Sequence, residues 1–354
     1  MTTRTTLNGA TPKSSAGLAG PMSRRRFIRI SGVAAGLGLA ALGGWTRLAR
    51  ASPILHEWRG VALGADASLR LYHPDAEEAE RLIADALAEV HRLERVFSLY
   101  DSTSALCRLN RDGSLADPPQ ELVELLAASA RYSRATGGAF DATVQPLWDL
   151  YTAHFGVAGA DPSGPPRQAI ERALSKCGYR RVILAPERIE FAGEAVAVTL
   201  NGIAQGYITD RVAELLRARG VAHTLIDMGE TRALDNHPAG RPWSVGIKDP
   251  HGVGIVKTIA IDNQAISTSG GYGTELDAAG RFNHIFDPAT GLCAARYLSV
   301  SVIAPTATCA DALSTAFSVM PIDRVGAVLV ETGALAAYFV LNDGTIVERK
   351  PQAG

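Results

Sequence analysis

The chain has 354 residues, of which 47% are hydrophobic and 20% are charged. It is long and apolar enough to bury a substantial core, which excludes a disordered chain and a disulfide-stapled miniprotein. Residues 1–51 carry eight Arg and Lys side chains and no Asp or Glu. The other 303 residues therefore hold 27 positive and 36 negative side chains, and this net charge of −9 argues against binding to nucleic acid or to an anionic membrane.

The first 51 residues have the pattern of an export signal. Arg24–Phe27 precedes an apolar run rich in Gly and Ala over residues 30–45, and Ala49–Ala51 offers small residues to a signal peptidase. Consecutive arginines before such a run resemble the twin-arginine signal of proteins exported folded to the bacterial periplasm. The run is shorter than the roughly 20 residues that span a bilayer, so we expect a cleaved signal over 1–51 and a periplasmic domain over 52–354.

Hydrophobic periodicity predicts alternating strands and helices in the rest of the chain. Period-two alternation predicts a strand pair over 54–72 with a turn near 64–66, and strands at 182–184, 195–200, 221–228, 243–247, 256–261, 298–304, 336–341 and 345–348. Recurrence at every third or fourth residue predicts helices at 76–97, 118–134, 206–219 and 310–320. Because strands outnumber helices and many can pair as hairpins, we expect an α+β fold with mixed, largely antiparallel sheets flanked by helices.

The four cysteines, Cys107, Cys177, Cys293 and Cys309, lie far apart and form no CxxC pair. Their spacing therefore does not indicate a metal site. An oxidising periplasm would permit disulfides, but four cysteines allow three pairings. We interpret them as scattered, mostly buried thiols.

Several polar, glycine-containing segments are too regular for ordinary loops. They are Phe97–Asn110, Thr136–Leu147, Leu200–Arg211 and Ala265–Gly291, with the predicted helix Cys309–Met320 behind them. Their strings GAFD with TVxPL, AISTSGxY, HxxDPxTG and ADALST resemble the ApbE family of FAD:protein FMN transferases, in the same order over roughly residues 60–320. The resemblance implies an ApbE-like flavin transferase fold that binds Mg²⁺ and FAD, moves FMN onto a Ser or Thr hydroxyl of a client protein, and releases AMP.

Asp311 and Thr315 are candidate metal ligands. They stand four residues apart in a predicted helix, so their side-chain oxygens project from one face. A carboxylate and a hydroxyl suit Mg²⁺, with phosphate and water oxygens completing the octahedron. Thr308 and Asp311 also have capping-box spacing, which by itself favours Asp311 as a helix-start residue. The resemblance instead assigns Asp311 and Thr315 to the metal and adds the backbone carbonyl of Gly202.

The resemblance also implies residues that contact FAD. They are Leu63, Tyr100, Ala139, Phe140, Asp141, Thr199, Gln205 and Phe286. A tyrosine face suits stacking on the isoalloxazine ring, and a tight Gly/Ala backbone supplies amide donors. Core packing is the alternative for Phe140, and a helix cap is the alternative for Asp141.

His284 is the candidate base for the acceptor hydroxyl, because imidazole titrates near working pH and this histidine opens the HxxDPxTG string. A lone histidine is more often structural, and it is the string that carries the assignment. Asp287 is the residue that would orient His284, or it holds the Asp-Pro turn. Residues 267–271 offer hydroxyls and amides to phosphate, although a plain polar turn explains them almost as well.

Two positions depart from the family pattern. Thr199 stands where the family has a carboxylate, and neutral Gln205 stands where it has a charged residue. The alternatives are therefore an FAD pyrophosphatase, in which water replaces the client hydroxyl, and a non-catalytic flavin-binding or delivery protein. These substitutions and the leader resemble the NosX-like branch, an accessory of nitrous oxide reductase. That branch implies a membrane-bound electron donor as client, so we expect contact with a membrane only through the client or an uncleaved leader.

Overall fold

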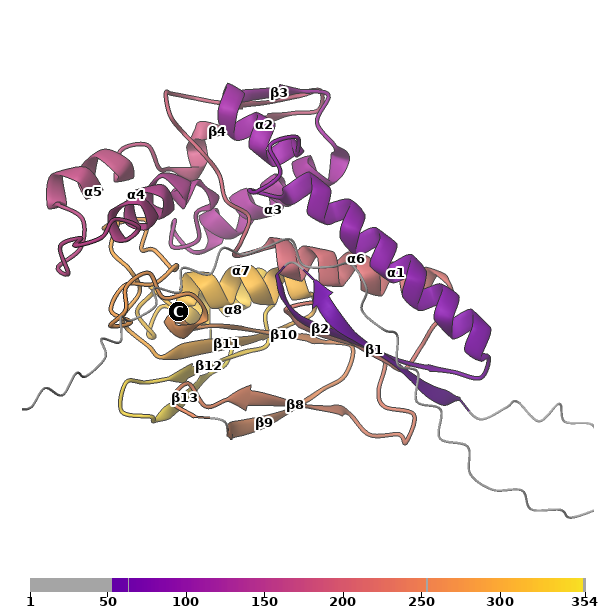
Figure 1. The fold of residues 1–354 in the computed structure, drawn as a ribbon. Helices are drawn as coiled ribbons and strands as arrows, with labels where there is room; N and C mark the ends of the chain where they lie inside the picture. Colours follow the sequence, from indigo (N-terminus) through magenta and orange to yellow (C-terminus); the bar gives the residue numbers. More distant parts are fainter. Residues whose placement is uncertain (1–52, 63, 253, 353–354) are drawn as a thin grey trace, which may run out of the picture.

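The computed structural model describes residues 53–62, 64–252 and 254–352. An eight-stranded antiparallel sheet forms the centre of the molecule (Figure 1). Its strands in spatial order are β1 (Ile54–Ala62), β2 (Ala65–His73), β6 (Thr224–Asp227), β7 (Thr231–Leu234), β10 (Ala265–Ser269), β11 (Ser299–Ala304), β12 (Ala336–Val340) and β13 (Ile346–Arg349). Two smaller sheets consist of β3 (Ser114–Ala116), β5 (Arg188–Phe191) and β4 (Val182–Ala185), and of β8 (Trp243–Lys248) and β9 (Ile255–Ile261).

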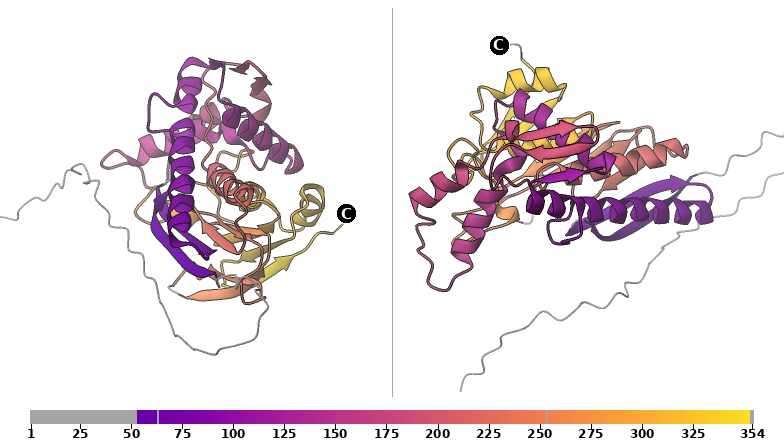
Figure 2. Two further views of the ribbon diagram at one scale, coloured as in Figure 1. Left: turned by 90° about the vertical axis from the view of Figure 1, so that its right-hand side faces the viewer. Right: turned by 90° about the horizontal axis from the view of Figure 1, so that it is seen from above.

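Helices cover one face of the large sheet, and the β8–β9 hairpin covers the other (Figure 1). The helices are α1 (Ala76–Phe97), α2 (Ala105–Asp112), α3 (Gln120–Ala135), α4 (Gln145–Phe155), α5 (Arg167–Leu174), α6 (Ala204–Ala218), α7 (Ala307–Phe317) and α8 (Val325–Thr332). Helices α4 and α5 lie at one end of the molecule and the β1–β2 hairpin at the other (Figure 2). The antiparallel sheets and the helices that cover them therefore confirm the predicted α+β class.

Helix α1 has the bounds that its sequence predicts. Its buried residues Ala79, Leu82, Ala86, Val90, Leu93 and Phe97 recur at three- and four-residue spacing and line one face. Asp75 caps the helix, since its carboxylate accepts a hydrogen bond of 3.0 Å from the Glu78 amide. The periodicity and the cap are both local signals, so sequence alone located this helix.

The strand predicted over residues 195–200 is wrong, because the partner of β4 is β5. Val196, Val198 and Leu200 are buried in alternation, so the period of two is real. These residues form an extended segment that does not pair with a neighbouring strand. The Asn110 side chain takes the place of a neighbouring strand, donating to the Val198 carbonyl and accepting from its amide, both at 2.8 Å.

Some elements and properties were not predicted from the sequence, or lie outside what the structure tests. Helix α2 and strand β10 occupy polar segments for which no element was predicted. All four cysteines are free thiols.

No helix within the described residues is long and apolar enough to cross a membrane. The predicted leader and Leu63 lie outside the described residues, so the leader and the proposed domain division stay predictions.

A buried ion pair fixes the start of α7 against α6. The guanidinium of Arg232 on β7 lies 2.6 Å from the carboxylate of Asp210 on α6, and both side chains are about nine-tenths buried. Asp210 also accepts from the backbone amides of Ala307 and Thr308, at 2.9 and 2.8 Å, and from the Thr308 hydroxyl. The N-cap of α7 is Thr306, so the Thr308–Asp311 capping box is wrong: Thr308 already bonds Asp210, and Asp311 lies in the second turn.

Replacing Arg232 with alanine should lower the free energy of unfolding by about 3–5 kcal/mol, because Asp210 would remain buried without its cation. Denaturant unfolding followed by circular dichroism measures this change. Arg81→Ala is the matched control: its salt bridge to Glu78 is exposed, so the unfolding midpoint should hardly move. Equal shifts in the two variants would contradict the proposed role of the buried pair.

Candidate active site

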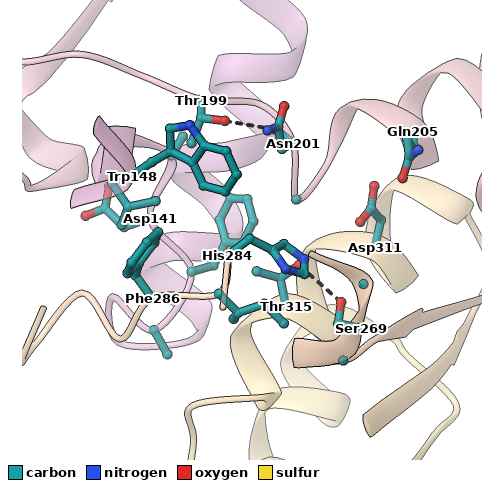
Figure 3. A pocket seen from close by; sticks show the side chains of 18 of the residues that line it. Asp141, Trp148, Thr199, Asn201, Gln205, Ser269, His284, Phe286, Asp311 and Thr315 are labelled. Atoms are coloured by element: carbon teal, nitrogen blue, oxygen red, sulfur yellow. Dashed lines mark hydrogen bonds between the residues drawn. The ribbon is translucent and has the colours of Figure 1, made fainter. Parts of the chain in front are cut away.

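A cavity lies where α6, α7 and the end of β10 meet the segment before α4 and the loop 284–288 (Figure 3). The predicted residues that line it are Ala139, Phe140, Asp141, Thr199, Gly202, Gln205, His284, Phe286, Asp311 and Thr315. Residues almost 180 positions apart in the sequence thus meet around one space. Tyr100 does not line it, and its side chain is 90% exposed. Asp287 does not line it either.

Close packing of α6 on α7 brings the predicted metal ligands together. The Gly206 amide on α6 donates a hydrogen bond of 2.9 Å to the Asp311 carboxylate on α7. A Cβ atom at residue 206 would lie 2.4 Å from the Ala307 carbonyl oxygen, so only glycine permits this approach. In the turn before α6, a Cβ atom on Gly202 would lie 3.0 Å from the Thr315 hydroxyl oxygen. Gly202, Asp311 and Thr315 therefore border the same corner of the cavity.

Two buried carboxylates, Asp311 and Glu230, line this corner. Burial raises the pKa of Asp311, the hydrogen bond from Gly206 lowers it in part, and the charge of Asp210 raises it further. Burial also raises the pKa of Glu230, and the neighbouring Asp311 charge adds to that rise. The nearby cation Arg232 already bonds to Asp210 and is not bonded to either of these two carboxylates. A bound cation would favour the charged forms of both carboxylates.

The donor set at this corner fits a hard divalent cation. It offers a carboxylate at Asp311, a hydroxyl at Thr315 and a backbone carbonyl at Gly202, all of them oxygens. Mg²⁺ prefers such ligands and keeps several of its sites for water and phosphate oxygens. Within the described ranges there is no cluster of three or more His, Cys, Asp and Glu side chains that could hold a metal. The fit therefore rests on mixed side-chain and backbone oxygens.

His284 projects toward the cavity from the loop after β10 (Figure 3). Its Nδ1 atom lies 3.3 Å from the Thr274 carbonyl oxygen. Since a carbonyl only accepts, this contact places the proton on Nδ1 and leaves the Nε2 lone pair available. Burial lowers the pKa of His284, and the Thr274 contact partly opposes that shift. The ring is therefore neutral at neutral pH and can accept a proton.

The two predicted aspartates hold local structure. Asp141 caps the short helix that starts at Ala142: it accepts from the Thr143 amide at 2.8 Å, from the Thr143 hydroxyl at 2.6 Å and from the Tyr179 amide at 2.8 Å. Asp287 accepts from the Ala289 amide at 2.9 Å, which holds the Asp-Pro turn. The capping and turn alternatives are thus the interactions that the structure contains, while the contact of Asp141 with FAD and the catalytic assignment of Asp287 stay predictions.

Sequence reasoning missed Glu230 and Trp148, which also line the cavity. Glu230 lies just after the predicted strand 221–228, where its carboxylate is visible in the sequence but received no role. Trp148 directly follows the TVxPL string. Its position after a recognised motif was the available signal, but only the tertiary structure directs it to the cavity.

Comparison with known proteins agrees with the motifs. The ApbE family model matches residues 63–339, which is more than half of the chain. The chain belongs to the ApbE family. It is 30% identical over 301 residues to a FAD:protein FMN transferase of Klebsiella pneumoniae, covering 81% of this chain and 82% of that protein. A FAD:protein FMN transferase of Treponema pallidum is 29% identical over 306 residues, covering 80% and 83%.

A solved structure shares the fold of this ApbE-family chain. The crystal structure of the ApbE protein from Thermotoga maritima superimposes with a TM-score of 0.74 at 30% sequence identity. The match covers 83% of this chain and 97% of that protein. The expected ApbE-like architecture is therefore confirmed.

Gly206→Ala should force α6 away from α7 and lower the free energy of unfolding by about 1–3 kcal/mol, because the new methyl group meets a backbone carbonyl. Denaturant unfolding measures the change. Gly254→Ala is the control, since a Cβ atom there meets nothing within 4 Å and its effect should stay within about 0.5 kcal/mol. A Gly206→Ala protein as stable as the control would show that the two helices tolerate a wider separation.

Proposed function

We propose that this protein is a Mg²⁺-dependent FAD:protein FMN transferase. Family membership supports this function, and the observation that carries it is that Gly202, Asp311, Thr315 and His284 line one cavity. The attacking group would be a Ser or Thr hydroxyl of a client protein. Its oxygen would form a bond to the phosphorus of the FMN half while the phosphoanhydride bond breaks and AMP leaves.

The side chains divide the work of this reaction. Nε2 of His284 would take the proton of the acceptor hydroxyl, since its Nδ1 atom faces the Thr274 carbonyl. Asp311, Thr315 and the Gly202 carbonyl would hold Mg²⁺. When bound, Mg²⁺ supplies positive charge that stabilises the negative charge growing on the phosphate oxygens. The Ser269 hydroxyl, 3.4 Å from Thr315 Oγ1, is placed to keep the threonine hydroxyl oriented.

Two neutral side chains favour a second candidate. Thr199 and Gln205 both line the cavity in places where the family has charged groups. The loss of those two charged groups favours a protein that binds or delivers flavin without catalysis, because fewer charges would hold FAD in the reactive pose. An FAD pyrophosphatase would use the same residues with water as the acceptor. Product analysis separates the three functions.

We place the reaction in the bacterial periplasm. The twin-arginine-type sequence before residue 30 supports export, and the acidic remainder of the chain is compatible with a small-molecule substrate and a protein client. A membrane-bound electron donor that serves nitrous oxide reductase is the client that the NosX-like features suggest.

The decisive experiment incubates the purified protein with FAD, Mg²⁺ and a candidate client domain, and follows AMP release and the intact mass of the client. Wild-type protein should release AMP and add one FMN to the client. Asp311→Asn keeps the size of the side chain but removes its charge, so both products should fall roughly a hundredfold or more. Asp112→Asn is the matched control and should remain active, because Asp112 is exposed, does not line the cavity and pairs with its neighbour Arg111.

The alternative functions leave different products in the same assay. AMP together with an unmodified client would indicate hydrolysis of FAD. Bound FAD without AMP, for wild-type protein and with every client that carries a Ser or Thr motif, would replace the transferase proposal with a flavin-binding function.

The pH dependence of transfer should report His284. The neutral imidazole is the active form, and burial lowers its pKa below the ordinary value of 6.5. The rate should therefore be flat around pH 7 and decline only as the pH falls through that lowered pKa. His284→Ala should reduce the rate about 10²- to 10⁴-fold and remove this acid limb, whereas His154→Ala should preserve it. An unchanged acid limb in His284→Ala would assign the titration to another group.

A further inference from the structure

A second hollow in the surface lies next to the cavity and has no role in the proposed reaction. It is a groove of about 400 Å³ between the first half of α4, the second half of α5 and the extended residues 195–197. We call it the α4–α5 groove. Its volume is that of a site for a small ligand or for a few residues of a peptide.

The α4–α5 groove and the cavity share two walls. Ala197 lines the groove, and Thr199, two residues later on the same segment, lines the cavity. On α4, Asp149 lines the groove and its neighbour Trp148 lines the cavity (Figure 3). An extended ligand that lies along residues 195–201 would therefore pass from the groove into the cavity.

The wall formed by this segment has an open backbone edge. The Val198 amide and carbonyl both bond to the Asn110 side chain, and the Thr199 amide donates to the Ala142 carbonyl at 2.7 Å. In extended backbone the N–H and C=O groups of successive residues point to opposite sides, so those of Ala197 point to the same side as the Thr199 amide. Within the described residues no hydrogen bond engages them. They are therefore available to an added strand.

The groove carries positive charge on an otherwise acidic body. Residues 167–181 hold five Arg and Lys side chains and one Glu, whereas the chain after residue 51 has a net charge of −9. Arg172 and Lys176 are exposed and line the groove, and in the described part of the chain neither charged group has a hydrogen bond or an ion pair. Asp149, the other charged lining residue, already accepts a hydrogen bond of 2.7 Å from within α4. The lining thus has free positive charge for carboxylates of a ligand.

We propose that the α4–α5 groove binds an acidic, extended segment of the client protein beside its acceptor Ser or Thr. The proposal rests on the proposed function, which requires a protein acceptor. The client backbone would pair with Ala197 as an added strand, and its carboxylates would meet Arg172 and Lys176. Ala197 in the groove and Asn201 in the cavity stand four residues apart. Paired extended chains advance at the same rate per residue, so the acidic side chain should stand about four residues from the acceptor hydroxyl.

Fluorescence anisotropy of the purified full-length protein tests the groove without turnover. The probes are two labelled peptides of glycine and alanine that contain one serine. A pair of glutamates stands four residues before the serine in one peptide and four residues after it in the other. Wild-type protein should bind one of them at least tenfold more tightly than the same peptide with glutamines in place of the glutamates.

Reversing the charge of the groove should abolish this preference. Arg172→Glu/Lys176→Glu should raise the Kd of the glutamate peptide about tenfold or more and leave the Kd for FAD unchanged, which shows that the fold and the cavity are retained. Arg217→Glu/Arg324→Glu is the matched control. It changes the net charge equally at two exposed arginines that do not line the groove, so it should bind the peptide nearly as wild-type protein does.

Methylation of the peptide backbone tests the added strand. One of the two alternating sets of peptide amides would face residues 195–197, so methylating that set should weaken binding about two- to tenfold, whereas methylating the other set should have little effect. With a client that accepts FMN, the groove variant should raise the KM for the client and leave kcat at saturating client unchanged. Equal binding of the two methylated peptides would contradict the added strand.

Three results would overturn the proposal: equal binding of glutamate and glutamine peptides, an unchanged Kd in the groove variant, or no peptide binding together with binding to phosphatidylserine vesicles that the groove variant loses. The third result would assign the basic residues to a membrane surface. If FMN transfer fails with every client while the groove variant still loses the glutamate peptide, the proposed function fails and the groove remains an acidic-peptide site. If transfer succeeds without any peptide preference, only the groove proposal fails.

Discussion

The absence of a side chain at residue 206 is the constraint on which the site depends. It lets α6 approach α7 until the Gly206 amide donates to the Asp311 carboxylate and residue 206 meets the Ala307 carbonyl. The same approach places the turn at Gly202 against Thr315. The close contact of α6 and α7 thus brings polar groups together, because backbone packing at this point leaves no room for side chains between the helices.

The acidic residues behind this contact differ in whether a cation balances their charge. Asp210 is fully used: Arg232, two backbone amides and the Thr308 hydroxyl all bond to it. Asp311 and Glu230 are also buried, and no Arg or Lys in the described part of the chain pairs with either of them; burial raises the pKa of each. The first carboxylate stabilises the fold, whereas the other two keep their capacity to attract positive charge into the cavity.

The remaining walls of the cavity come from segments that differ in local structure. The Asp141 cap and the buried residues of α4 hold the wall that carries Trp148, and the Asp287 turn holds the loop that carries His284. Strand β10 places Ser269 at its end, within a hydroxyl network that includes Ser314 at 2.7 Å. Each wall is therefore held by its own local contacts.

The sequence by itself determined the family, the α+β class and elements such as α1 and the β1–β2 hairpin, because motif strings, caps and hydrophobic periods are local properties. It also located most of the cavity-lining residues through their motifs. Tertiary structure alone excluded the capping role of Asp311: Thr308 and Asp311 have capping-box spacing, but the N-cap is Thr306 and Thr308 bonds to Asp210. The metal-binding role of Asp311 stays a prediction. The tertiary structure also showed that residues 195–200 alternate without pairing, and that Trp148 and Glu230 line the cavity. These outcomes depend on contacts between residues far apart in the chain, and no local pattern records which distant group a side chain will meet.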